Sequence, residues 1–140
     1  LDPGKTYHFR AKATNAAGIA YGAARTFTTP LAMPTVTPDA ATGQGAIAAT
    51  LNGTLADNGG EDCDCGLEWG LDTGYGITTP TESKSTSESF SQVIGGLEPG
   101  TTYHFRAFAT NSAGTAYGAD RTFTTSLIIN KAYALAREEL

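Results

Sequence analysis

Two cysteines separated by one residue, Cys63 and Cys65, are the first side chains in this sequence that could do chemistry. In an extended segment, residues two apart point to the same side, so the two thiols would lie together. A direct bridge between them would be strained, and two thiolates without a nearby histidine fall short of the four ligands of a zinc site. The adjacent carboxylates Glu61, Asp62 and Asp64 lack the spacing of a calcium loop. The residues favour free or partly buried thiols over a disulfide of some kind, including one between chains, and a metal site is the least favoured of the three.

The two histidines, His8 and His104, are further candidates for acid–base chemistry. Each lies between aromatic residues that we expect to point inward, so each imidazole is expected to face solvent. A general base needs a nucleophile and an orienting partner, and the sequence contains no Gly-x-Ser-x-Gly elbow. A glycosidase-type carboxylate pair would need a cleft, which short loops do not provide. The sequence therefore predicts no catalytic residue, no metal, no cofactor and no enzyme.

The composition narrows the class of protein and of partner. Charged residues make up 16% of the chain, the formal net charge is −5, and there is no basic cluster, so a nucleic-acid partner is not expected. No run of 18 apolar residues is present, so the sequence predicts no membrane insertion. The 17 glycines, with abundant threonine and alanine, favour short strands joined by tight turns.

An internal repeat sets the organisation of the chain. Residues 1–29 match residues 97–125 at 23 of 29 positions, with an offset of 96 residues. This period is close to the length of an immunoglobulin-like sandwich, about 100 residues. We expect one complete unit over residues 30–125, and we expect residues 1–29 to be the last two strands of a preceding unit. Residues 126–140 are expected to form a linker or a short C-terminal helix that begins at Asn130.

Alternation of apolar and polar side chains predicts the strands of the complete unit. The expected strands cover residues 35–41, 47–55, 65–70, 90–94, 102–110 and 115–125, with a polar stretch rich in threonine and serine before residue 89. Ile47 is expected to face the core at the start of its strand. In the segment 102–110, Tyr103 and Phe105 are expected to point inward, and Arg106 and Phe108 outward. Such a series of short strands predicts an all-β antiparallel sandwich of two sheets, of the immunoglobulin-like class that has seven strands.

A local motif resembles a known family. The segment Leu97-Glu98-Pro99-Gly100-Thr101-Thr102-Tyr103 resembles the fibronectin type III pattern Leu-x-Pro-Gly-Thr-x-Tyr, which enters the sixth strand of that immunoglobulin-like sandwich. The resemblance implies that Tyr103 forms a tyrosine corner, that Leu97 is its core partner, and that Pro99 and Gly100 shape the turn. Tyr7 is the equivalent in residues 1–29. The sequence pattern Tyr-x-Phe-Arg-Ala-x-Ala-Thr-Asn looks most like microbial or phage versions of the domain.

Three other residues are candidate structural or contact positions. Trp69, on the expected third strand, is typical of related immunoglobulin-like sandwiches and is assigned to the core. Phe108 and Arg106 form a candidate interaction surface, because an outward aromatic beside an outward arginine could meet a neighbouring module, a sugar or another chain.

These observations predict a non-catalytic extracellular structural or adhesion module of a tandem-repeat surface protein or filament. A two-stranded hairpin is unstable alone, so we expect residues 1–29 to pair with an incomplete sandwich, their own or another chain's, by strand exchange. The alternatives are a carbohydrate-binding or spacer domain attached to a secreted enzyme, and a phage virion protein used in host attachment. The expected partners are other copies, neighbouring repeats, and a glycan or surface receptor.

Overall fold

All regular structure in the computed structural model, which describes residues 1–128, is β-strand. Over these residues there is no helix long and apolar enough to cross a membrane. The helix expected from Asn130 onward lies outside the described residues.

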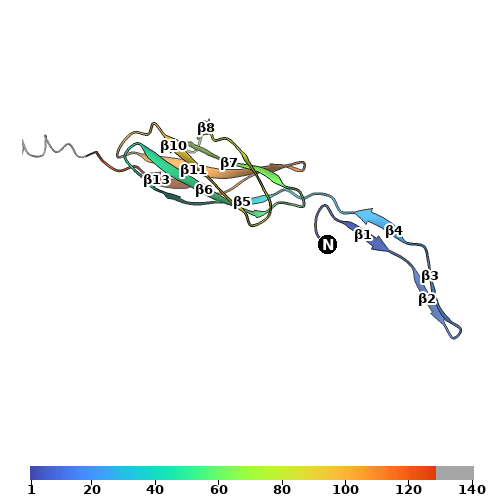
Figure 1. Ribbon diagram of the computed structural model, residues 1–140. Coiled ribbons are helices and arrows are strands. Elements are labelled where there is room, and N and C mark those ends of the chain that lie inside the picture. The colour runs from blue at the N-terminus through green and yellow to red at the C-terminus, as the bar shows by residue number, and fades with distance from the viewer. Residues whose placement is uncertain (129–140) are drawn as a thin grey trace, which may run out of the picture.

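Residues 35–124 form two antiparallel sheets that face each other (Figure 1). The first sheet has the order β10-β6-β5, with bounds β5 (Thr35–Thr42), β6 (Ala48–Asp57) and β10 (Ser89–Gly95). In the second sheet, the long strands β7 (Cys63–Gly70) and β11 (Thr102–Asn111) pair at the centre. Along the outer edge of β11 lie the short strands β12 (Gly114–Tyr117) and β13 (Arg121–Thr124). Along the outer edge of β7 lie β8 (Ile77–Thr78) and β9 (Glu82–Lys84). The all-β sandwich predicted from the sequence is confirmed.

The core forms between the two sheets because side chains alternate along every long strand. In β11 each second residue from Tyr103 to Asn111 is buried, and the residues between them are partly exposed. Strands β6 and β10 follow the same period of two. The buried apolar side chains come from both sheets: Val36, Ala49, Leu51, Leu55, Cys63, Cys65, Leu67, Trp69, Phe90, Ile94, Leu97, Tyr103, Phe105, Ala107, Ala109 and Phe123.

A cluster of four aromatic rings lies on the second sheet's inner face, toward the end where β11 begins and β7 ends. Tyr103 stacks on Phe123 with ring centroids 5.6 Å apart, and Trp69 meets Tyr103 edge-on at 5.8 Å. Phe105, which has no exposed surface, contacts Phe123 edge-on at 6.0 Å. Offset and edge-on pairs of this kind add to the stabilisation that comes from burying the rings.

Three local expectations were wrong. Ile47 lies just before β6 and is 58% exposed, so the inward series of that strand begins at Ala49. The single strand expected over 115–125 is two strands, because the chain leaves the ladder over residues 118–120, as it does over the equivalent residues 22–24 of the first copy. In the second copy this break lies against β5. A Cβ at Gly118 would lie 2.6 Å from Pro38 Cδ, so only glycine fits this close approach. The polar stretch before residue 89 contains two short strands, β8 and β9.

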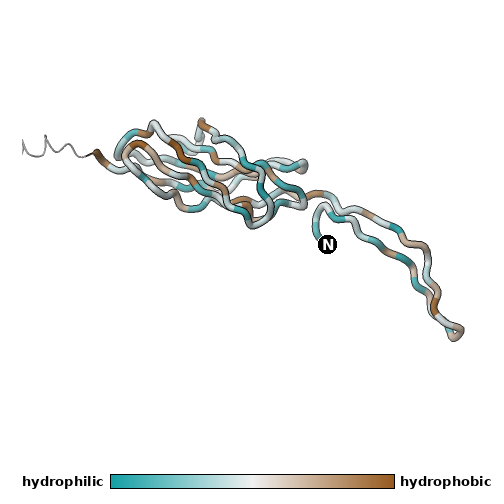
Figure 2. The backbone as a smooth tube through the Cα atoms, viewed as in Figure 1, coloured by the Kyte–Doolittle hydropathy of each residue, from teal (hydrophilic) through white to brown (hydrophobic). Residues whose placement is uncertain are grey.

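Residues 1–29 form a separate hairpin that extends away from the sandwich (Figure 1). Its base pairs β1 (Thr6–Phe9) with β4 (Arg25–Thr28), and its tip pairs β2 (Lys12–Asn15) with β3 (Gly18–Tyr21). Apolar and polar segments alternate along both arms (Figure 2). The hairpin therefore has the pattern of a half-buried sheet.

The hairpin joins the sandwich through the turn after β6. Residues 30–34, the connecting segment, lie between the hairpin and β5. Ala32 N in this segment donates to Gly59 O at 2.9 Å, which aligns the segment with the turn. Asn111 Nδ2 donates to Ala32 O at 2.8 Å and to Asn58 O at 3.0 Å. Gly60 lies so close to the Pro3 backbone that a Cβ there would be 2.5 Å from Pro3 O. The junction is therefore held by backbone contacts at Gly59 and Gly60 and by the Asn111 side chain.

Candidate functional site

The turn that carries the family motif has the same geometry in both copies of the repeat. Glu98 N donates to the Tyr103 hydroxyl at 2.9 Å, and Asp2 N donates to the Tyr7 hydroxyl at 2.8 Å. A threonine closes each turn: Thr125 Oγ1 donates to Glu98 O at 2.6 Å, and Thr29 Oγ1 donates to Asp2 O at 2.6 Å. These bonds lie within each hairpin, so the turn of the first copy has the geometry of the second although no sandwich surrounds it.

The surroundings of the two hairpins differ. Tyr103, Phe105 and Phe123 are at most 5% exposed. Of their equivalents, Phe9 is 53% exposed, Phe27 is 44% exposed and Tyr7 is half-buried against the Phe27 ring. Within the described part of the chain, nothing covers this face of the hairpin. We call the face formed by Tyr7, Phe9, Ala11, Ala13 and Phe27 the donor face, because the identical residues of the second copy complete a core.

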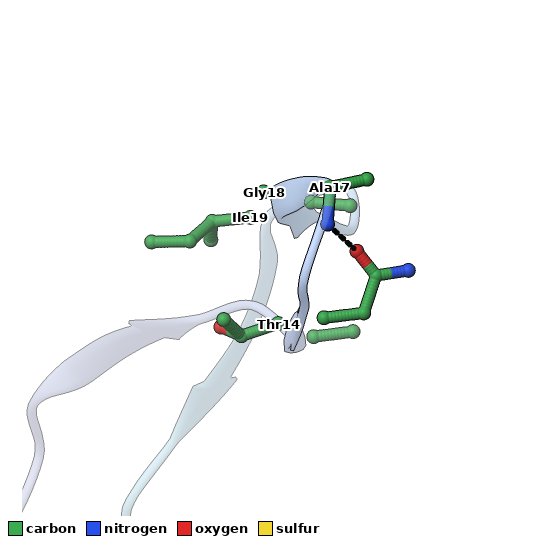
Figure 3. A pocket seen from close by; sticks show the side chains of 7 residues that line it. Thr14, Ala17, Gly18 and Ile19 are labelled. Carbon is green, nitrogen blue, oxygen red and sulfur yellow. Dashed lines mark hydrogen bonds between the residues drawn. The ribbon is translucent and has the colours of Figure 1, made fainter.

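The hairpin tips show one further difference in partners. Asn15 Oδ1 accepts a hydrogen bond from Ala17 N at 2.9 Å, which shapes the turn drawn in Figure 3. Asn111 Oδ1 makes the same bond to Ala113 N at 2.9 Å. Of the two asparagines, Asn111 alone also donates through Nδ2 to carbonyls outside its hairpin, Ala32 O in the connecting segment and Asn58 O in the sandwich. The open hollow beside the Asn15 turn is lined by exposed residues of the hairpin tip alone.

The outer face of the second sheet carries a stack of aromatic and charged groups. The Arg106 guanidinium lies over the Tyr117 ring at 3.9 Å and over the Tyr75 ring at 4.7 Å. It also makes an ion pair with Glu68, with Arg106 Nη2 2.8 Å from Glu68 Oε2. Phe108 is half-buried rather than exposed, since its ring covers Gly66, where a Cβ would lie 2.6 Å from Phe108 Cζ. Arg106 is thus already engaged within the sheet.

The two histidines occupy different environments on this outer surface. His104 Nδ1 lies 2.8 Å from Asp120 Oδ2, and Asp120 Oδ1 accepts from the Tyr75 hydroxyl at 2.9 Å. His8 is exposed on the hairpin, where Ala24 replaces Asp120. Among residues 1–128, no serine, threonine or cysteine side chain is hydrogen-bonded to either imidazole. The histidine–carboxylate pair therefore links β11 to the segment between β12 and β13 at the surface.

Three of the six positions at which the two hairpins differ lie where the second copy contacts its sandwich from outside. Phe108 covers Gly66, Ser112 binds Glu61 through Oγ at 2.9 Å, and Asp120 binds Tyr75. The first copy has Lys12, Ala16 and Ala24 at these places, and the other differing pairs are Asp2/Glu98, Lys5/Thr101 and Ile19/Thr115. No difference falls on the donor face. Sequence comparison of the copies located these positions, but their contacts with β7 and the loops beside it needed the structure.

The two cysteines point into the core from the first half of β7. Both are free thiols and at most 1% exposed. Cys63 Sγ donates to Glu61 O at 3.4 Å, and Cys65 Sγ donates to Cys63 O at 3.7 Å. Among residues 1–128, no group of three or more histidine, cysteine or acidic side chains is arranged to hold a metal. Burial raises the pKa of both thiols, that of Cys65 to about 11.

These thiols should be unreactive in the folded protein. At about pH 8 we expect a thiol reagent to label neither cysteine before unfolding and both after it. Since the folded state holds the Cys65 proton up to about pH 11, from an ordinary pKa of 9.0, unfolding releases a proton between these values. The free energy of unfolding should therefore fall as pH rises through this window, by at most about 2–3 kcal/mol. Denaturant unfolding measured across the window tests this, and Cys65→Ala should flatten the slope.

Comparison with solved structures identifies the fold. Domains d3 and d4 of the extracellular region of rat CD45 match with a TM-score of 0.64 and 18% identity, over 89% of this chain and 66% of that one. The sensor domain of the anti-sigma factor RsgI4 from Pseudobacteroides cellulosolvens, in its solution structure, matches with a TM-score of 0.55 and 22% identity, over 71% and 80%. The sixth fibronectin type III domain of human fibronectin type III domain containing protein 3 matches with 0.53 and 23%, over 74% and 93%. The sandwich has the fibronectin type III fold.

The fibronectin type III resemblance read from the motif is therefore confirmed at the level of the fold. No protein-family model matches the sequence, and no curated protein matches it. In this fold, Trp69 lies on the third strand of the sandwich, β7, and packs on the tyrosine of the corner. Leu97 is 3% exposed, and the turn at Pro99 and Gly100 reverses the chain ahead of β11.

Proposed function

We propose that this chain is a non-catalytic structural module of a secreted or cell-surface protein built from tandem fibronectin type III-like repeats. In this proposal, the hairpin of residues 1–29 completes a sandwich other than the one formed by residues 30–125. The observation that carries the proposal is the donor face, which matches the buried face of β11 and β13 residue for residue and is uncovered here. An apolar surface of this kind marks an interaction site.

The connecting segment is too short for the hairpin to replace β11–β13 in its own sandwich. Ser126, which follows β13, bonds to Gly45 at one end of the sandwich, whereas Thr35 pairs with Asp57 at the other end. The ten residues of β6 separate these ends by about 30 Å. After such a replacement, Thr29 would have to reach Thr35 over six residues, at most about 22 Å. The acceptor must therefore be another sandwich.

The internal order of the hairpin supports the same proposal. The two hydrogen bonds at the Tyr7 turn and the bond between Thr6 Oγ1 and Thr28 Oγ1, 2.8 Å long, reproduce those of the second copy. A preformed hairpin loses less conformational entropy on docking than a flexible segment.

The similar structures give support of a general kind. The match to CD45 involves two consecutive domains of an extracellular region. It covers 89% of this chain, whereas the sandwich of residues 30–125 makes up about two thirds of the chain. The alternative of glycan binding at Phe108 and Arg106 has less support. The first side chain is half-buried over Gly66, and the second is paired with Glu68.

Loss of the donor face should abolish self-association. We expect the chain of residues 1–140 to associate with increasing concentration, and the Phe9→Ser, Phe27→Ser double variant to stay monomeric, because it removes the apolar area that would be buried. Sedimentation equilibrium measures the mass of each. The thermal stability of the sandwich should not change, since neither ring contacts its core.

The control is Ile19→Ser. This residue is as exposed as Phe9, at 54%, but it lies opposite Thr14 on the other face of the hairpin. The variant should associate like the unmodified chain. Equal association of the double variant and the unmodified chain would remove the hairpin from the proposal.

A further inference from the structure

We infer that the acceptor for the hairpin is the acidic strand set of residues 30–96 in a second copy of this chain, and that Lys12 selects it. This inference rests on the proposed function, and names the partner. Residues 1–29 carry four basic side chains and one acidic, a net charge of +3. Residues 30–96 carry nine acidic side chains and one basic, a net charge of −8. The resident hairpin, residues 97–125, has a net charge of zero.

The strand register places these opposite charges together. In the resident pairing, Phe108 lies opposite Gly66 on β7, and Lys12 is its equivalent. Asp64 and Glu68 are two residues to either side of Gly66, on the same outer face of β7. Diagonal neighbours of this kind are within reach of a long side chain. Arg10 would take the place of Arg106 beside Glu68, which leaves the exposed Asp64 to pair with Lys12.

The two hairpins compete for one acceptor through their outer contacts. Both supply the same residues to the core, so burial of the donor face does not distinguish them. The resident hairpin alone has Asp120, bonded to Tyr75, and Ser112, bonded through Oγ to Glu61. It is also tethered, which raises its effective concentration. The hairpin of residues 1–29 carries the positive charge that complements the negative charge of residues 30–96, and the attraction between them is strongest at low salt.

Weakening the resident hairpin should therefore drive exchange. Phe105→Ala removes a fully buried ring from β11 and leaves its equivalent, Phe9, intact. By sedimentation equilibrium at about 50 mM salt we expect this variant to associate more strongly than the unmodified chain. At about 500 mM salt its association constant should fall about tenfold or more, because exposed charges are then screened. Adding Phe9→Ala should abolish the association.

Charge reversal identifies the contact. In the Phe105→Ala background, Lys12→Glu should weaken association about tenfold, and so should Asp64→Lys, which changes an exposed residue without a hydrogen bond in the described structure. Mixing these two variants should restore association, because the reversed charge on the hairpin of one chain then meets the reversed charge on β7 of the other.

The outcomes separate the two levels of the proposal. Association that depends on Phe9 but not on salt, Lys12 or Asp64 would overturn the acidic acceptor and keep the role of the hairpin. Absence of association in the Phe105→Ala chain, with the sandwich still folded by circular dichroism, would overturn both.

Discussion

The Phe105→Ala substitution should destabilise the sandwich by about 3–5 kcal/mol, because it removes a fully buried ring and leaves a cavity between the sheets. Phe105 also loses its edge-on contact with Phe123. Denaturant unfolding followed by tryptophan fluorescence measures the change, since Trp69 lies in the same core. The measurement belongs at high salt and low protein concentration, where the proposed pairing between chains is suppressed.

The repeat provides a matched control for this prediction. Phe9→Ala makes the same change in an identical local sequence, but its ring is 53% exposed and outside the sandwich. We expect it to change the free energy of unfolding by less than about 0.5 kcal/mol under these conditions. Similar losses for both variants would show that the hairpin of residues 1–29 shares a core with residues 30–125, in conflict with the fold described here.

Asn111→Ala should cost about 2–3 kcal/mol, because it leaves the partly buried Ala32 carbonyl without a donor and weakens the turn at Ala113. The Asn111 side chain is 9% exposed and makes three hydrogen bonds, two from Nδ2 to Ala32 O and Asn58 O and one from Ala113 N to Oδ1. Denaturant unfolding measures the loss. Slower proteolysis of the connecting segment than in the unmodified chain would contradict the prediction, because the asparagine fastens that segment to the sandwich.

Asn15→Ala is the corresponding control. Asn15 makes only the turn bond to Ala17 N among the described contacts. We expect it to leave the unfolding of the sandwich within about 0.5 kcal/mol of the unmodified chain. The difference between the two asparagine variants then measures the contribution of the Nδ2 bonds.

The fold was predictable because alternation and a turn motif are local signals. The inward series Tyr103, Phe105, Ala107 and Ala109 appears in the sequence as a period of two, and the structure buries all four. The break between β12 and β13 does not follow from alternation, and it recurs between β3 and β4 of the first copy, so it depends on the local sequence and not on the strand beside it. The prediction that Ile47 faces the core was wrong, because an apolar residue at a strand end has the right spacing but is not covered by the second sheet.

The candidate site was only partly visible in the sequence. Comparing the two hairpins showed that Lys12 replaces Phe108, but not that Asp64 and Glu68 flank the position. That placement depends on the pairing of β7 with β11, whose residues are about forty positions apart in the sequence. Phe108 was expected to be exposed, and the glycine opposite, which lets its ring settle onto the sheet, carries no local signal of this role.

The opposite placement of Thr35 and Ser126 has a mechanical consequence. A tensile force applied through the flanking segments would act nearly parallel to the strands, because the chain enters at one end of the sandwich and leaves at the other. The hydrogen bonds between β5 and β6 and between β11 and β13 would then be loaded in shear and would have to break together, instead of one after another. A module loaded in this direction resists stretching with all the hydrogen bonds of these strand pairs at once.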